Sequence, residues 1–195
     1  MNKSEFVRSF QEADQPFHPH EVSQRVRKAI GCVSSYHGDP DLSTEHFRGY
    51  MVRYKEKPNR SAEDPELYIC VISTQQSAAY QHVIWIKEII QIFDSVDHRT
   101  DTADKLQTML VNRATNPTHS SEGESHVVAD KNGFILALGV AVPRAYREIC
   151  RKQNFLARYP NEDIEKLLNI PAEFVEFVLG QDFEKEFEAA LAACE

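Results

Sequence analysis

The polar residues best placed to do chemistry lie inside an apolar segment, HVIWIKEIIQIFD, at residues 82–94. Lys87 and Gln91 are four positions apart, which places their side chains on one face of a helix, and Glu88 follows Lys87 directly. An ammonium group in apolar surroundings needs a partner, because an unpaired buried charge is strongly destabilising. The segment therefore predicts an ion pair that includes Lys87. The alternative is a lysine whose amino group reaches solvent at the edge of the helix.

His126 and Asp130 form a second candidate group, because their spacing of four positions also fits one helix face. With Glu88 they would supply one imidazole and two carboxylates, which are ligand types found in catalytic zinc sites. A weak metal site made of Glu88, Asp130 and His126 is therefore an open alternative. The only closely spaced histidines, His18 and His20, flank a proline, and we expect them in an exposed turn.

Other catalytic patterns are missing from the sequence. It contains no Gly-x-Ser-x-Gly and no glycine-rich phosphate loop, and its seven glycines are widely separated. The four cysteines form no Cys-x-x-Cys pair, which argues against a zinc ribbon or a thioredoxin-type motif. We expect reduced, mostly buried thiols.

The charge is unevenly distributed along the chain. There are 22 basic and 30 acidic residues, giving a net charge of −8, and the segment from Pro160 to Glu195 alone holds ten acids and two bases. No basic footprint for phosphates is visible, so direct nucleic-acid binding is disfavoured. The chain has no long apolar run and no apolar stretch near Met1. We expect a soluble cytoplasmic protein without a membrane partner.

The pattern of apolar residues predicts one α+β domain that is mainly helical. Residues 46–55 alternate, residues 67–73 are apolar, and together they predict a small antiparallel sheet. The segment 78–94 is too long for most strands and carries a single polar stripe, so we predict a central buried helix. Further helices are predicted at residues 4–13, 20–30, 102–114, 127–142 and 144–151, with a loop at 116–124.

The C-terminal part predicts short helices at 164–168, 172–179 and 183–193. The first two could be read as helix-turn-helix, but their acidic residues would be repelled by phosphate, so we predict a hairpin packed on the core. In the last helix Phe183, Phe187 and Leu191 form an apolar stripe. We expect this stripe to dock and the acids Glu184, Glu186 and Glu188 to face solvent or a basic partner.

The order of these elements resembles the ImmA/IrrE family of zinc metallopeptidases, which cut helix-turn-helix repressors. A strand (LYICVIS), a buried helix, a small-residue helix ending in Val142-Pro143 and the segment DIEKLLNIPAEFVEFVL carry the resemblance, over about residues 66–179. In that family the buried helix carries His-Glu-x-x-His, whose histidines bind zinc while the glutamate acts as general base. The matching residues here are Lys87-Glu88-Ile89-Ile90-Gln91, and the third, acidic ligand falls on Asp130.

The resemblance implies a zincin-like fold in which Glu88 is a vestigial general base, while Lys87, Gln91 and Asp130 occupy the former zinc-ligand positions. Lysine cannot ligate a cation while protonated. We therefore expect a zinc site converted into an ion-pair site, with Lys87 between Asp130 and Glu88 and no cofactor.

The resulting interpretation is a catalytically inactive, regulatory member of the family, of bacterial or phage-related type. It would bind a protein partner such as a helix-turn-helix regulator of a repressor or mobile-element system. One alternative is a metal-dependent peptidase, with zinc as cofactor, that uses an atypical site of Glu88, Asp130 and His126. The other is a scaffold protein that binds through its acidic C-terminal helix. The expected organisation is N-terminal helices at 1–45, a core at 46–180 and the C-terminal helix at 181–195, all in one compact unit.

Overall fold

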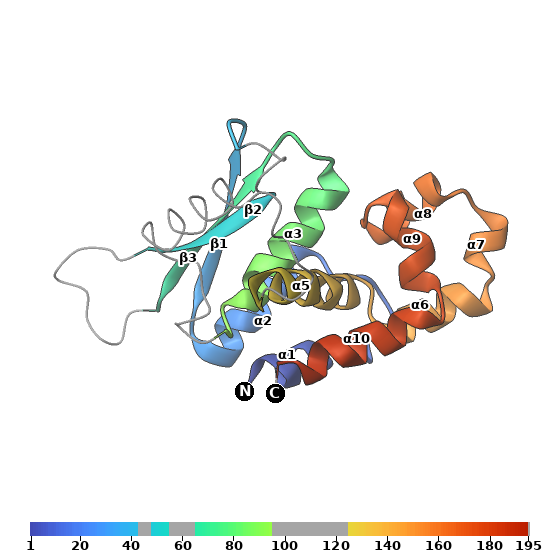
Figure 1. Ribbon diagram of the computed structural model, residues 1–195, viewed down its shortest axis with the longest axis horizontal. Coiled ribbons are helices and arrows are strands. Elements are labelled where there is room, and N and C mark those ends of the chain that lie inside the picture. The colour runs from blue at the N-terminus through green and yellow to red at the C-terminus, as the bar shows by residue number, and fades with distance from the viewer. Residues whose placement is uncertain (43–47, 55–64, 95–124, 195) are drawn as a thin grey trace.

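A three-stranded sheet lies at one end of the molecule and the C-terminal helices lie at the other (Figure 1). The computed structural model describes residues 1–42, 48–54, 65–94 and 125–194, and in the last range it describes side chains from residue 131 onward. The fold is α+β and mainly helical, as predicted. The predicted helix 102–114, the loop 116–124 and the ends of strand 46–55 lie outside the described residues.

The sheet consists of β1 (Val33–Asp39), β2 (Gly49–Tyr54) and β3 (Leu67–Ser73), in the order β1-β3-β2. The predicted antiparallel pairing of β2 with β3 is confirmed, with Met51 opposite Cys70. The prediction of a purely antiparallel sheet is wrong, because β1 pairs with β3 in parallel. The strand β1 escaped prediction because its sequence, VSSYHGD, is mostly polar and lies at an exposed edge, so it lacks the apolar alternation of a half-buried strand.

The helix α3 (Ala78–Gln91) is the predicted central buried helix, and every residue from His82 to Ile90 is buried. Its N-terminus is capped by Ser77, whose side chain accepts a hydrogen bond from the backbone N–H of Tyr80. It packs against the sheet and against α5 (Ser125–Ala141), the predicted small-residue helix. Figure 1 shows α3 and α5 in the middle of the molecule, between the sheet and the C-terminal helices.

The N-terminal helices are α1 (Lys3–Arg8) and α2 (Pro19–Ile30). Helix α1 is shorter than the predicted range 4–13, because the chain turns at Ser9, whose hydroxyl bonds to the Phe6 carbonyl instead of continuing the helix. Helix α2 begins at Pro19, one residue earlier than predicted, and ends as expected at Gly31, which has a φ of 74°.

Five helices complete the chain. The predicted hairpin is formed by α8 (Asn161–Leu168) and α9 (Ala172–Leu179), joined through Asn169 in the left-handed conformation. The hairpin packs on the core through Ile164, Leu168, Val175 and Val178, which are buried, whereas Leu167 is 51% exposed. The other three helices are α6 (Arg144–Lys152), α7 (Phe155–Arg158) and α10 (Asp182–Ala192).

The apolar stripe of α10 docks as predicted, with Phe183, Phe187 and Leu191 all buried. Gly139 on α5 makes this packing possible, since a Cβ atom there would lie 2.1 Å from the Phe187 ring. Three of the four cysteines, Cys32, Cys70 and Cys150, are buried, which confirms the prediction of mostly buried thiols. Within the part of the chain that is described, no helix is both long and apolar enough to cross a bilayer.

Candidate functional site

The site predicted from the sequence centres on Lys87 and Glu88 of α3. The Lys87 Nζ atom lies 3.1 Å from Glu88 Oε1, and the two side chains are only 8% and 2% exposed. The predicted ion pair with Glu88 is confirmed, and the alternative of a solvated lysine is wrong. Both side chains are buried because α3 is covered on one side by the sheet and on the other by α5.

Residues from two other elements surround the pair. Gly133 of α5 lies against Lys87 and Gln91, since a Cβ atom at Gly133 would be 3.5 Å from Lys87 Cγ and 3.7 Å from Gln91 Nε2. Cys70 of β3 is fully buried, and this burial, followed by the negative charge of Glu88, raises the pKa of its thiol well above the ordinary value. The pair thus belongs to the layer between the sheet and α5, beside a thiol that stays protonated and neutral.

Asp130 and His126 belong to α5, one and two turns before Gly133. Their side chains lie outside those that the structure describes. The expected contact of Asp130 with Lys87 and the alternative metal site of Glu88, Asp130 and His126 therefore stay predictions. Among the described side chains, no group of three His, Cys, Asp or Glu residues is arranged to hold a metal ion.

Lys87 and Gln91, which the resemblance aligns with zinc ligands, do not fit zinc. An ammonium group occupies the position of the first imidazole, and it repels a dication and has no lone pair. Gln91 could offer only a neutral carbonyl oxygen. Glu88, which would have to activate a metal-bound water, lies instead beside the ammonium of Lys87.

A second polar centre on α3, at His82, was missed by the sequence reasoning. Its Nε2–H donates to the carbonyl of Phe17 at 3.0 Å, and its Nδ1 accepts a hydrogen bond from the amide of Asn169. The neutral imidazole therefore ties α3 to the loop before α2 and to the α8–α9 joint. No local signal identifies these contacts, because the partners are 65 and 87 positions away in the chain.

Two histidines next to this centre are exposed as predicted, but they begin a helix and do not form a turn. His18 and His20 flank Pro19 at the start of α2, and both are exposed. Their rings stack at 5.3 Å, and the His18 ring meets His82 edge-on at 5.2 Å. A positive charge on His18 therefore acts directly on the buried imidazole.

We expect His82 to make folding sensitive to acid. Burial, and then the charge of His18, lowers the pKa of His82 from 6.5 to about 4. Between these values the unfolded chain binds a proton that the folded chain does not, so stability is fully present above pH 6.5 and falls as the pH drops towards 4. The loss amounts to about 3 kcal/mol.

Urea denaturation at a series of pH values, followed by Trp85 fluorescence, measures this pH-dependent loss of stability. His82→Gln should flatten the profile, and identical profiles for the two proteins would disprove the effect.

The acidic C-terminal helix is attached to the rest of the chain more firmly than expected. Glu184 of α10 accepts hydrogen bonds from Arg147 at 3.0 and 3.1 Å and from Arg151 at 3.1 Å. Burial alone would raise the pKa of Glu184, but the two guanidinium groups outweigh it and lower the pKa. Glu188 pairs with Arg8 of α1 at 3.0 Å.

The expectation that these acids face solvent or a partner is therefore wrong for Glu184, whereas Glu188 is exposed as expected and pairs with an exposed arginine. Charge patterning along α10 could not indicate this, because it does not show which arginines fold against the helix. Deleting residues 181–195 would remove buried Phe183, Phe187 and Leu191 as well. Such a truncation tests folding, so a role of α10 in binding has to be tested with single exposed residues.

Comparison of the chain with protein-family models, with curated proteins and with solved structures gives no significant match.

Proposed function

We propose that this protein is a catalytically inactive relative of the ImmA/IrrE zinc metallopeptidases and acts by binding a protein partner. The observation that carries the proposal is the buried ion pair of Lys87 with Glu88 on α3. The pair occupies the two helix positions at which such a peptidase needs a zinc ligand and a general base.

The chemistry of metal-assisted hydrolysis explains why this pair matters. The reaction requires a metal-bound water and a carboxylate able to take its proton. Here the carboxylate of Glu88 is 2% exposed and lies beside an ammonium group, so a metal-bound water could not reach it. In the folded protein each of the two charges compensates the other, so neither is left unpaired in the core.

The surface charge supports a basic protein as the partner, such as the DNA-binding region of a helix-turn-helix regulator. Glu162 and Asp163 on α8 and Glu173 and Glu176 on α9 are all exposed on the hairpin. An acidic surface speeds association with a basic one and discourages binding of nucleic acid itself.

Metal analysis of the purified protein tests the proposal. We expect well under one zinc per chain, no chelator-sensitive cleavage of a helix-turn-helix repressor and no rise in melting temperature when zinc is added. The double variant Lys87→His with Gln91→His should gain zinc binding, because it restores two imidazoles on one face of α3. Saturating zinc at 100 times its Kd would then stabilise this variant by about 2.7 kcal/mol.

The matched control is Lys87→Met with Gln91→His, which also removes the ammonium group but supplies only one imidazole. It should bind zinc far more weakly than the double-histidine variant. The proposal fails if the wild-type protein copurifies with stoichiometric metal that EDTA removes together with a peptidase activity. The site of Glu88, Asp130 and His126 would then be the better interpretation.

A further inference from the structure

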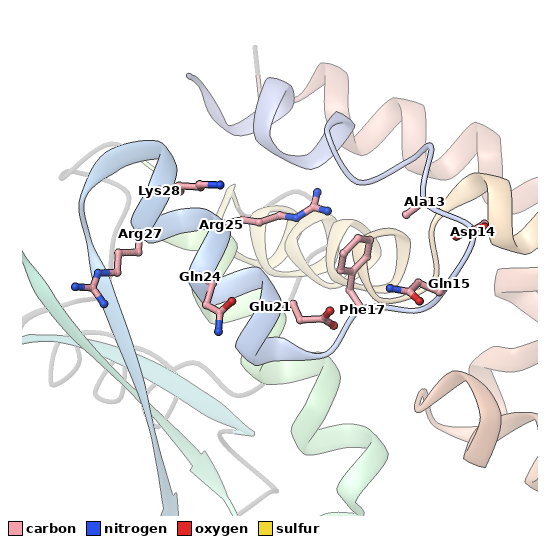
Figure 2. A pocket seen from close by; sticks show the side chains of 9 residues that line it. All are labelled: Ala13, Asp14, Gln15, Phe17, Glu21, Gln24, Arg25, Arg27 and Lys28. Atoms are coloured by element: carbon pink, nitrogen blue, oxygen red, sulfur yellow. The ribbon is translucent and has the colours of Figure 1, made fainter.

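A groove lies between α2 and the loop that leads into it, on a surface to which the proposed function assigns nothing (Figure 2). It is a wide groove of about 690 Å³ that is open to solvent. The helix α2 contributes Glu21, Gln24, Arg25, Arg27 and Lys28 to its lining, and the loop contributes Ala13, Asp14, Gln15 and Phe17. Figure 2 shows the Arg25 side chain reaching from the helix towards Phe17.

Arg25 is held in place before any ligand arrives. Its guanidinium carbon lies 4.6 Å from the centre of the Phe10 ring and 4.5 Å from that of Phe17, and both rings are buried. One N–H donates to the carbonyl of Ser9 at 3.3 Å. An arginine that is already ordered loses little conformational freedom on binding, and its planar group suits a carboxylate.

Three cations and two carboxylates, Asp14 and Glu21, line the groove, and neither carboxylate pairs with Arg25 or Lys28. No described carboxylate lies within ion-pair distance of Arg25 or Lys28. Glu21, four positions before Arg25, accepts a hydrogen bond from the backbone N–H of His18 at 2.9 Å and so caps the start of α2 instead. Lys28 is one helical turn after Arg25, which places both charges on the same face.

The uncharged polar residues of the groove suit a peptide backbone. Gln15 and Gln24 are exposed on opposite walls, and a carboxamide can pair with both the N–H and the C=O of an extended chain. The protein as a whole carries a charge of −8, so its long-range field repels acidic ligands. An acidic ligand that binds must therefore be recognised by local contacts in this groove.

We propose that the groove between α2 and residues 13–17 binds an acidic, extended segment of a partner protein, with a carboxylate on Arg25 and Lys28 and its backbone on Gln15 and Gln24. The site is separate from the Lys87–Glu88 pair. Its ligand also has the opposite charge to the partner surface proposed for the acidic α8–α9 hairpin.

Fluorescence anisotropy with the full-length protein and dye-labelled hexaglutamate tests this inference. We expect saturable binding at low salt that weakens at about 150 mM salt, while hexaglutamine binds far less. Lys28→Glu should weaken hexaglutamate binding about tenfold or more, since it puts a like charge against the ligand. Lys28 is exposed, so melting curves should show that the variant still folds.

Lys152→Glu is the matched control, because Lys152 is also an exposed lysine in the last turn of its helix and the change in net charge is the same. It should weaken binding about twofold or less, through the long-range field alone.

Equal losses in the two variants, or no saturable binding of hexaglutamate to the wild type, would overturn the inference. A dimer in sedimentation experiments that is lost in Lys28→Glu would overturn it too, in favour of a second copy as occupant. None of these outcomes depends on zinc content, so this inference and the proposed function can fail separately.

Discussion

Replacing Lys87 by methionine is expected to lower the free energy of unfolding by about 3–5 kcal/mol. Methionine fills nearly the same space, so little packing is lost. The change instead removes the ammonium group 3.1 Å from the Glu88 carboxylate, which is 2% exposed and cannot turn to water. Urea denaturation followed by the fluorescence of Trp85, the only tryptophan, measures the loss.

The double variant Lys87→Met with Glu88→Leu should recover most of that loss, because an apolar pair can replace a buried ion pair at little cost. Lys185→Met, at an exposed position of α10, is the control and should leave the curve nearly unchanged. A loss below roughly 1 kcal/mol in the single variant would mean that water reaches the pair in solution.

Replacing Arg147 of α6 by leucine should have an effect of similar size, about 3–5 kcal/mol. Arg147 is fully buried, and it holds Glu184 through two hydrogen bonds while donating to the carbonyls of Gly139 and Val142. Its guanidinium group also lies 4.7 Å from the centre of the Phe183 ring. Leucine would leave the two carbonyls without this donor and Glu184 with Arg151 alone, and it would loosen α10 from α6, which thermal and urea melts would report.

Two further substitutions, at Arg144 and at Arg147 itself, separate the loss of these contacts from a general loss of charge. Arg144→Leu removes an arginine from the same helix, but its pair with Glu148 is exposed, so the loss should stay below about 0.5 kcal/mol. Arg147→Lys keeps the charge without the planar fork and should fall between the two. Equal stability of Arg147→Leu and Arg144→Leu would show that the cluster around Glu184 contributes nothing to folding.

Several features could be predicted because they depend on neighbours along the chain. The apolar run with one polar stripe indicated α3, and the alternation before Tyr54 and the apolar run of β3 indicated two strands. Errors arose where local signals were weak. The strand β1 is polar, and α1 stops at Ser9 because a hydroxyl competes with the helix backbone.

At the candidate site, too, the sequence predicted what depends on neighbouring residues and missed what depends on packing. The sequence indicated that Lys87 would need a partner, since a charge in a buried helix must be compensated. Glu88, the next residue in the chain, was a candidate partner, and the structure shows this ion pair. The burial that makes the pair inaccessible depends on how α5 and the sheet cover α3, and spacing along one helix cannot reveal that cover.

The sequence by itself determined the helical state of α3, the end of α2 at Gly31, the apolar stripe of α10 and the demand for charge compensation at Lys87. These follow from side-chain periodicity, backbone conformation and solvation, which act over a few residues. Only the tertiary structure decided that His82 bonds to Phe17 and Asn169, and that Glu184 turns inward to two arginines. Those contacts join residues that are distant in the chain, and a hydrogen bond or ion pair forms only where the packing of whole elements brings donor and acceptor within about 3 Å.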